Sequence, residues 1–161
     1  MKQLILIRHA KSSWDAPLDD FDRPLTVKGI KDAHLVSSNI GNHLPKTFLV
    51  WCSSAKRATE TAIIFAQNIS FPAESIIYKQ ALYTFDQMQL EKIVKSCSDD
   101  FDHLIVFGHN EAITNFVNHY GSIIIDNVST SVFVNIIFDQ NNWKNIAKGI
   151  TKHVIFPNDL K

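Results

Sequence analysis

The chain has 161 residues, of which 45% are apolar, and its 16 basic residues equal its 16 acidic residues in number. This length predicts a single domain, residues 1–161, with enough apolar material for a sizeable core. The balanced charge argues against nucleic acid as a partner and against a polybasic membrane contact. The first apolar run, residues 4–7, is too short for a signal peptide, so we expect a cytoplasmic protein.

Short apolar runs alternate along the chain with longer amphipathic stretches. The runs predict strands at 2–8, 47–52, 75–78, 103–107, 131–138 and 145–150, and the stretches predict helices at about 27–44, 55–68, 86–97 and 111–120. This alternation predicts an α/β fold with three layers, α/β/α, around a mostly parallel sheet. The last two strands follow one another around Asn141, which predicts an antiparallel hairpin at a sheet edge.

The first predicted strand ends in Arg8 and His9. A strand that ends there aims a cation and an imidazole out of its carboxyl end. Such a pair suits the handling of a phosphate group, because Arg can bond two phosphate oxygens at once. Taken alone, the pair is more often part of a solvated loop.

The predicted loop between residues 9 and 25 is the longest one and is rich in Asp and Pro. Long loops in compact domains are often functional, so we expect it to shape the rim of a site. Ser12 and its neighbours, residues 11–14, follow His9 closely and are candidates for the mouth of a pocket. Arg23 either reaches that pocket or braces the loop, and Thr26 is the predicted N-cap of the next helix.

Two further strand ends carry residues of the same kinds. Arg57 lies shortly after the strand that ends at residue 52, and His109 follows the strand at 103–107. Each residue also has a non-functional explanation: Arg57 as a surface cation, and His109 as a turn histidine with its hydrogen bonds satisfied. Asn110 either lines the pocket mouth or caps the following helix. Because ligands of such sheets bind beyond the carboxyl ends of the strands, we expect Arg8, His9, Arg57 and His109 to converge on one pocket.

These segments resemble the histidine phosphatase superfamily, also called the phosphoglycerate mutase-like superfamily. Its pattern is Arg-His-Gly or Arg-His-Ala after a strand, a later Ser-x-x-x-Arg-x-x-x-Thr segment and a late Gly-His. Within the superfamily the chain is most similar to the SixA-like phosphohistidine phosphatases, and the resemblance runs through essentially its whole length. The matching residues are 8–12, Ser53, Arg57, Thr61, 22–26, Gly29, 108–110 and 156–160.

The resemblance implies a mechanism. His9 would attack phosphorus and form a phosphohistidine enzyme, which water then hydrolyses to release inorganic phosphate. Arg8 and Arg57 match the arginines that clamp the phosphate, and His109 matches a second histidine that donates a hydrogen bond to a phosphoryl oxygen. No cofactor is expected, since no phosphate-binding or dinucleotide-binding glycine motif occurs. Two arginines would repel a metal dication, so we expect no metal either.

The general acid is the open point of the resemblance. Many superfamily members protonate an alkoxide leaving group with a carboxylic acid, often Glu, in the loop after the third strand. Here residues 82–86 read Leu-Tyr-Thr-Phe-Asp, so the candidates are Asp86, Asp22 and Asp20. Each is equally explained as a solvated or helix-capping carboxylate. The lack of an acid would favour a phosphorus–nitrogen bond, because imidazole leaves more readily than an alkoxide.

Three functions remain open at this point. The first is a phosphatase that acts on phosphohistidine in a protein, and the second is a phosphomonoesterase that acts on a small phosphorylated molecule. The third is a phospho-ligand binding module without turnover, which the presence of His9 disfavours. Little inserted sequence is present to form a lid, so we expect an open pocket that would accept a phosphorylated residue of another protein.

Overall fold

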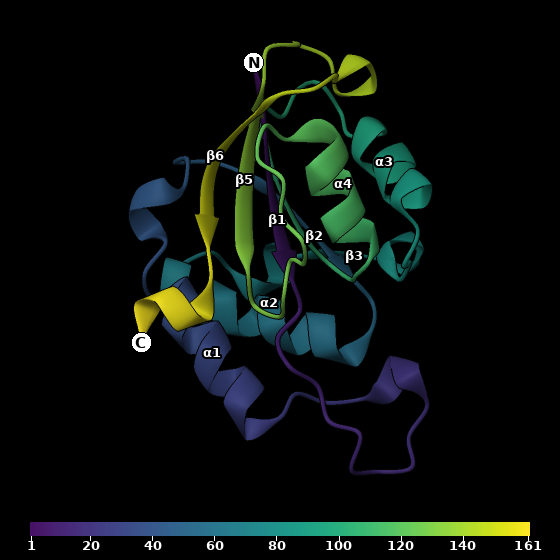
Figure 1. Cartoon of the computed structure of the whole chain (residues 1–161), viewed down its shortest axis with the longest axis vertical. Helices are drawn as coiled ribbons and strands as arrows, with labels where there is room; N and C mark the ends of the chain where they lie inside the picture. The colour runs from purple at the N-terminus through teal and green to yellow at the C-terminus, as the bar shows by residue number, and fades with distance from the viewer.

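Six strands form the central sheet of the computed structural model, which describes residues 1–161 (Figure 1). They are β1 (Lys2–Arg8), β2 (Leu49–Ser53), β3 (Ile77–Lys79), β4 (His103–Gly108), β5 (Phe133–Phe138) and β6 (Ile150–Ile155). Their order across the sheet is β3-β2-β4-β1-β5-β6. The strands from β3 to β1 run parallel, while β5 is antiparallel to β1 and β6 is antiparallel to β5. The predicted α/β class and the antiparallel edge pair are confirmed.

Four α-helices cover the two faces of this sheet. They are α1 (Val27–Ser37), α2 (Lys56–Ile69), α3 (Gln87–Lys95) and α4 (Ala112–Tyr120). The first two pack against each other on one face, and α3 packs against α4 on the other, which gives the expected three layers (Figure 1). None of the helices combines the length and the apolar character needed to cross a bilayer.

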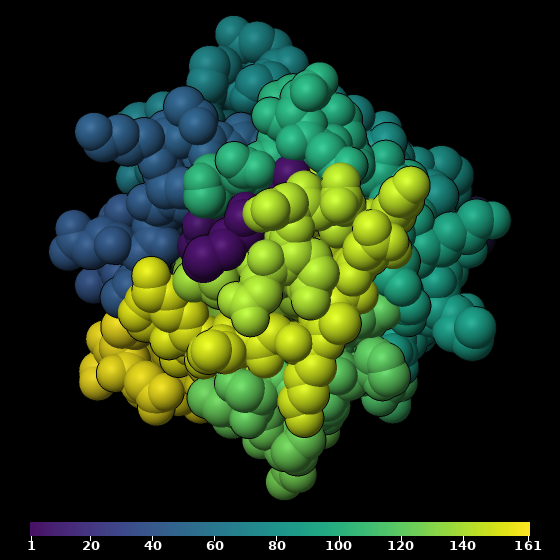
Figure 2. Space-filling model, turned by 90° about the horizontal axis from the view of Figure 1, so that it is seen from above, coloured from purple at the N-terminus to yellow at the C-terminus, as the bar shows by residue number.

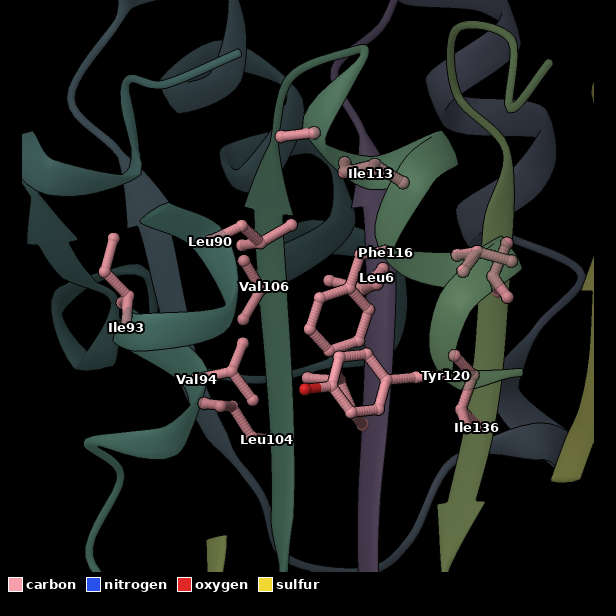
Figure 3. Packing of buried hydrophobic residues seen from close by; sticks show 14 of the residues in the cluster. Leu6, Leu90, Ile93, Val94, Leu104, Val106, Ile113, Phe116, Tyr120 and Ile136 are labelled. Carbon is pink, nitrogen blue, oxygen red and sulfur yellow. The ribbon is translucent and has the colours of Figure 1, made fainter. Parts of the chain in front are cut away.

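The core consists of two apolar clusters, one on each face of the sheet. In β1 the side chains alternate: Leu4 and Leu6 belong to the cluster under α3 and α4, and Ile5 and Ile7 belong to the cluster under α1 and α2. A strand that is buried on both faces reads as a continuous apolar run. Figure 3 shows Leu6 packed beside Phe116 of α4 in the first cluster. Because the sheet is packed on both faces, the positions of its strand ends relative to one another are fixed.

The helix predicted at 27–44 is too long, because α1 ends at Ser37. The side-chain amide of Asn39 donates to the carbonyl of Leu35, which caps the last turn, and a short 3-10 turn follows at Gly41–His43. Ile40 is fully buried even so. The apolar pattern therefore continues past the end of the helix because a turn places these residues in the same core.

The strand predicted at 145–150 is wrong, since residues Trp143–Asn145 form a 3-10 turn and β6 begins at Ile150. Trp143 is fully buried, and its indole N–H donates to the carbonyl of Phe101 at 2.7 Å. This anchor folds segment 139–149 over the amino-terminal end of the sheet. Figure 2, which looks onto that end, shows the yellow-green segment lying beside the purple start of the chain.

Candidate functional site

A cavity of about 320 Å³ opens where β1, β2 and β4 end, at the opposite end of the sheet from Trp143. In Figure 1 this is the lower end, where the chain leaves β1 and enters the long purple loop. Ten of the lining residues are polar, and the full set is Arg8, His9, Lys11, Ser12, Trp14, Asp20, Arg23, Arg57, Phe85, His109, Asn110 and Thr130. The structure thus brings together residues from both halves of the chain.

His9 follows the last residue of β1 and is only 7% exposed. Its Nδ1 lies 2.7 Å from the carbonyl oxygen of Ala10, which can only accept, so Nδ1 carries the proton of the neutral ring. Its Nε2 accepts from Nε–H of Arg57 at 3.3 Å, which requires the same tautomer. Burial lowers the pKa of His9 to about 3, and the neighbouring cations Arg57 and Arg8 act in the same direction. His9 is therefore neutral, with its lone pair on Nε2.

Thr61 holds the segment after His9 against α2. Its hydroxyl accepts from the backbone N–H of Ala10 at 2.9 Å and donates to the carbonyl of Arg57 at 2.7 Å. These two bonds tie the end of β1 to the first turn of α2. They explain why His9 and Arg57, 48 residues apart in sequence, lie in contact.

His109 follows β4 and is 1% exposed. Its ring centroid lies 5.1 Å from that of His9, and its Nε2 lies 2.8 Å from the hydroxyl oxygen of Ser53 at the end of β2. Its Nδ1 is buried without a hydrogen-bond partner. Burial lowers the pKa of His109 to about 2, with His9 and Arg57 adding to the effect. This ring is therefore neutral as well.

The arginines bring the positive charge. Arg57 is 3% exposed and Arg23 is 6% exposed. Arg8 donates from one terminal nitrogen to the carbonyl of Val128 at 3.1 Å, and its Nε is buried without a partner. Burial and the proximity of Arg57 lower the pKa of Arg8 from its usual high value. Buried guanidinium groups with free N–H donors require an anion nearby.

Asp20 is the anion that meets two of these arginines. Its carboxylate accepts from Arg57 and from Arg23, each at 2.9 Å, and from the hydroxyl of Tyr83. Its backbone carbonyl accepts a further bond from Arg57 at 2.6 Å. Partial burial opposes ionisation, but the hydrogen bonds from Tyr83, Arg57 and Arg23 outweigh it and hold the pKa of Asp20 well below its usual range. Asp20 is therefore an ionised carboxylate.

The other two candidate acids lie outside the pocket lining. The carboxylate of Asp86 accepts from the backbone N–H of Met88 and so caps the start of α3. Asp22 is exposed at the end of a short 3-10 turn, Asp20–Asp22, with no side-chain partner. Neither residue is among those that line the cavity.

Arg23, Ser12 and Asn110, the predicted rim residues, all line the cavity. Arg23 braces the loop as well, because it donates to the backbone carbonyl of Ser13 at 2.9 Å and to the hydroxyl of Ser12. Asn110 likewise has both predicted roles, since its side-chain oxygen accepts from the backbone N–H of Thr114 in α4. The two alternatives weighed for Arg23 and for Asn110 are thus compatible.

Sequence reasoning gave no role to the aromatic residues after β3. The rings of Tyr83 and Phe85 lie edge-on to His109, with centroids 5.3 and 5.7 Å away. In the sequence they are marked only by their spacing, two aromatic residues separated by one position and followed by the candidate acid Asp86. Thr130, in the segment before β5, was missed as a lining residue and carries no local signal.

The site thus combines two neutral imidazoles with buried cations that retain unused N–H donors. One imidazole, His9, presents a lone pair between guanidinium groups. A tetrahedral oxyanion bound there would meet donors on several sides. When Arg57 turns its Nε–H from His9 to an oxygen of that anion, the lone pair on Nε2 is free to face the central atom. This arrangement suits transfer of a phosphoryl group to an imidazole nitrogen.

Comparisons with known proteins agree with this geometry. The model of the histidine phosphatase superfamily (branch 1) matches residues 4–91. An uncharacterized protein of Mycobacterium tuberculosis is 33% identical over 103 residues, which cover 64% of this chain and 62% of that protein. The match therefore spans less than two thirds of the relative's length.

Two solved structures share the fold over almost the whole chain. The SixA protein of Nakamurella multipartitia superimposes with a TM-score of 0.83 at 22% identity, covering 97% of this chain and 96% of the other. The protein histidine phosphatase SixA in complex with tungstate superimposes with a TM-score of 0.82 at 20% identity, covering 99% of each chain. At these identities the likeness concerns the fold.

Proposed function

Because the chain belongs to the histidine phosphatase superfamily, we propose that it is a phosphatase that works through a covalent phosphohistidine on His9 and acts on phosphohistidine in a protein. The observation that carries this proposal is the state of His9. Its proton is fixed on Nδ1 by Ala10, and its Nε2 lone pair lies beside Arg57 in a buried cationic pocket. A neutral imidazole needs no separate base to act as a nucleophile, and its Nε2 lone pair is released when Arg57 turns its N–H to a bound phosphoryl oxygen.

In the first step Nε2 of His9 attacks phosphorus, the new N–P bond forms, and the bond from phosphorus to the leaving group breaks. In the second step water attacks phosphorus, the N–P bond to His9 breaks, and phosphate leaves. Arg8 and Arg57 stabilise the charge on the phosphoryl oxygens in both steps, and His109 donates a further hydrogen bond. Deleting one such donor typically costs about 3 to 4 kcal/mol of transition-state stabilisation.

The candidate acids support a phosphorus–nitrogen substrate. An alkoxide leaving group needs a proton, yet Asp20 is ionised and engaged by Arg57 and Arg23, and neither Asp22 nor Asp86 lines the cavity. A phosphohistidine that is protonated on its second ring nitrogen leaves as neutral imidazole and needs no such acid. Trp14 and Phe85, 75% and 53% exposed at the mouth, offer apolar surface to a partner protein.

The test compares two substrates. Hydrolysis of a phosphohistidine peptide and of an aryl phosphate ester is measured with EDTA present, for the wild type and for His9→Ala. The proposal expects turnover of the peptide that depends on His9 and far exceeds turnover of the ester. A reversed preference would point instead to a phosphomonoesterase for a small molecule. Absence of His9-dependent turnover on both substrates would point to a binding module.

A further inference from the structure

The hydroxyl of Ser53 has no role in the steps above, although it lies in the site. Ser53 is the last residue of β2, and its side chain is fully buried. Its oxygen accepts from the backbone N–H of Ala55 at 3.2 Å and lies 2.8 Å from Nε2 of His109. These are its two hydrogen-bond partners. The proton between Ser53 and His109 can therefore belong to either residue.

Hydrogen-bond accounting distinguishes the two cases. If Ser53 donates to Nε2, the neutral ring of His109 carries its proton on Nδ1, and only Nδ1–H lacks a partner. If Nε2–H donates to Ser53, the hydroxyl hydrogen has no acceptor and the Nδ1 lone pair is unpaired as well. Each unpaired polar group in a buried site costs free energy. The first arrangement, with one unpaired group instead of two, is therefore favoured.

Nδ1 of His109 is one of two buried nitrogen atoms in the site that lack a hydrogen-bond partner. Nε of Arg8 is also buried without a partner, and both residues line the same cavity. Both atoms would be donors in the favoured arrangement, so an anion in the cavity would supply the acceptor that each lacks. The opposite tautomer of His109 would instead turn a lone pair on Nδ1 toward that anion.

We propose that Ser53 is a positioning residue: its hydroxyl donates to Nε2 of His109 and thereby keeps the proton of His109 on Nδ1 as a donor to the phosphoryl group. The part about the phosphoryl group rests on the proposed function, whereas the tautomer does not. Ser53 and Ala10 then act alike. A hydroxyl on Nε2 makes His109 a donor, and a carbonyl on Nδ1 makes His9 a nucleophile.

The tautomer is measured directly by NMR on protein with ¹⁵N-labelled histidine, at neutral pH and without substrate. We expect His109 of the wild type to show a protonated Nδ1 and an unprotonated Nε2, and Ser53→Ala to show a population with the proton on Nε2. A wild-type His109 that carries its proton on Nε2 would overturn the proposal. This readout is independent of catalysis, so it stands even if no phosphorylated substrate is turned over.

Kinetics of the same variants separate positioning from mere structural support. Ser53→Ala should lower kcat about 10- to 100-fold, the range typical of partners that orient metal-binding histidines, with a smaller change in KM. Added inorganic phosphate should shift the Nδ1 resonance of His109 in the wild type and much less in the variant. Ser53→Thr, which keeps the hydroxyl, should restore the wild-type tautomer.

Ser37→Ala is the matched control, because it removes another buried hydroxyl away from the site, which donates to the carbonyl of Ala33 in α1 and accepts from Asn68 near the end of α2. We expect it to leave both kcat and the tautomer of His109 unchanged. Loss of kcat in Ser53→Ala with an unchanged tautomer would show that Ser53 only supports the fold. A kcat near that of the wild type would equally overturn the proposal.

Discussion

Two imidazoles and their protons decide the chemistry at the scale of single residues. His9 and His109 have their pKa values lowered to about 3 and about 2, chiefly by burial. Ordinary histidines titrate near pH 6.5. Both rings therefore stay neutral across the physiological range, and His9 keeps its lone pair without deprotonation by a base. The site thereby keeps a neutral nucleophile at physiological pH, but the two buried neutral rings make the folded protein less stable at low pH.

This cost predicts a pH dependence of stability. Between about pH 6.5 and the lowered folded-state values, the unfolded chain binds more protons than the folded one, so the free energy of unfolding falls as pH falls. Each ring contributes up to about 1.4 kcal/mol per pH unit. Denaturant unfolding from pH 7.5 to 5 should show a shallower slope for His9→Gln than for the wild type. Equal slopes would mean that His9 titrates normally in the folded protein.

Asp20 gives a second prediction at this scale. Its carboxylate occupies donors of Arg57 and Arg23 that an incoming anion would use. Asp20→Asn removes the competing charge, so inorganic phosphate should bind about tenfold more tightly, or ~1.4 kcal/mol. Binding is measured by calorimetry, with Asp22→Asn as the control because Asp22 is exposed outside the cavity. Weaker phosphate binding by Asp20→Asn would show that its main role is to orient the arginines.

At the scale of elements, the site depends on how α1 docks against the segment after His9. The backbone N–H of Thr26 donates to the carbonyl of Lys11 at 2.9 Å, and the hydroxyl of Thr26 caps α1 by accepting from Gly29. The first turn of α1 therefore lies directly on Lys11. At Gly29 an added Cβ would come within 2.2 Å of the Lys11 carbonyl oxygen. Only glycine allows this close approach.

Gly29→Ala should therefore push α1 away from Lys11. We expect a loss of about 1–3 kcal/mol in the free energy of unfolding, as for other overpacked sites, together with a lower kcat/KM because Lys11 follows the nucleophile. Gly41→Ala is the matched control, since a Cβ there meets no atom within 4 Å. Denaturant unfolding and steady-state kinetics of both variants test this. Equal behaviour of the two would contradict the docking account.

The sequence predicted those elements whose signal is local. The strand ends that carry His9, Arg57 and His109 follow apolar runs, which is why their convergence could be predicted. The bonds of Asp20 could not, because the path of its loop is set by side-chain contacts rather than by periodicity. The hairpin was misplaced for the same reason: the burial of Trp143, a long-range contact, decides where β6 begins.

At the scale of the whole molecule, the site and the buried ammonium group of Lys2 lie at opposite ends of the sheet. Lys2 begins β1 and is 1% exposed, whereas Arg8 ends it, about 20 Å away at the usual rise per residue. The ammonium group of Lys2 donates to the carbonyls of Asp99 and Phe101 and to the carboxylate of Asp102. The hydrogen bonds of Lys2 thus stabilise the fold, and Lys2 does not line the cavity.

Lys2→Met should therefore separate stability from activity. It removes the three hydrogen bonds that the ammonium group donates, so we expect a loss of about 1–3 kcal/mol in the free energy of unfolding, while kcat stays unchanged. Lys152→Met, at an exposed position of β6, should change neither quantity. Thermal unfolding and kinetics well below the transition test this. A large fall in kcat for Lys2→Met would show that the two ends are coupled.

The most direct test of the central claim is to trap the phosphorylated enzyme. Protein mixed with a phosphohistidine peptide is quenched within milliseconds in alkali and analysed by mass spectrometry. We expect one phosphoryl group on His9, labile in acid and stable in base, and none in His9→Gln. Hydrolysis of the peptide without such an intermediate, or a phosphoryl group on another residue, would contradict the account.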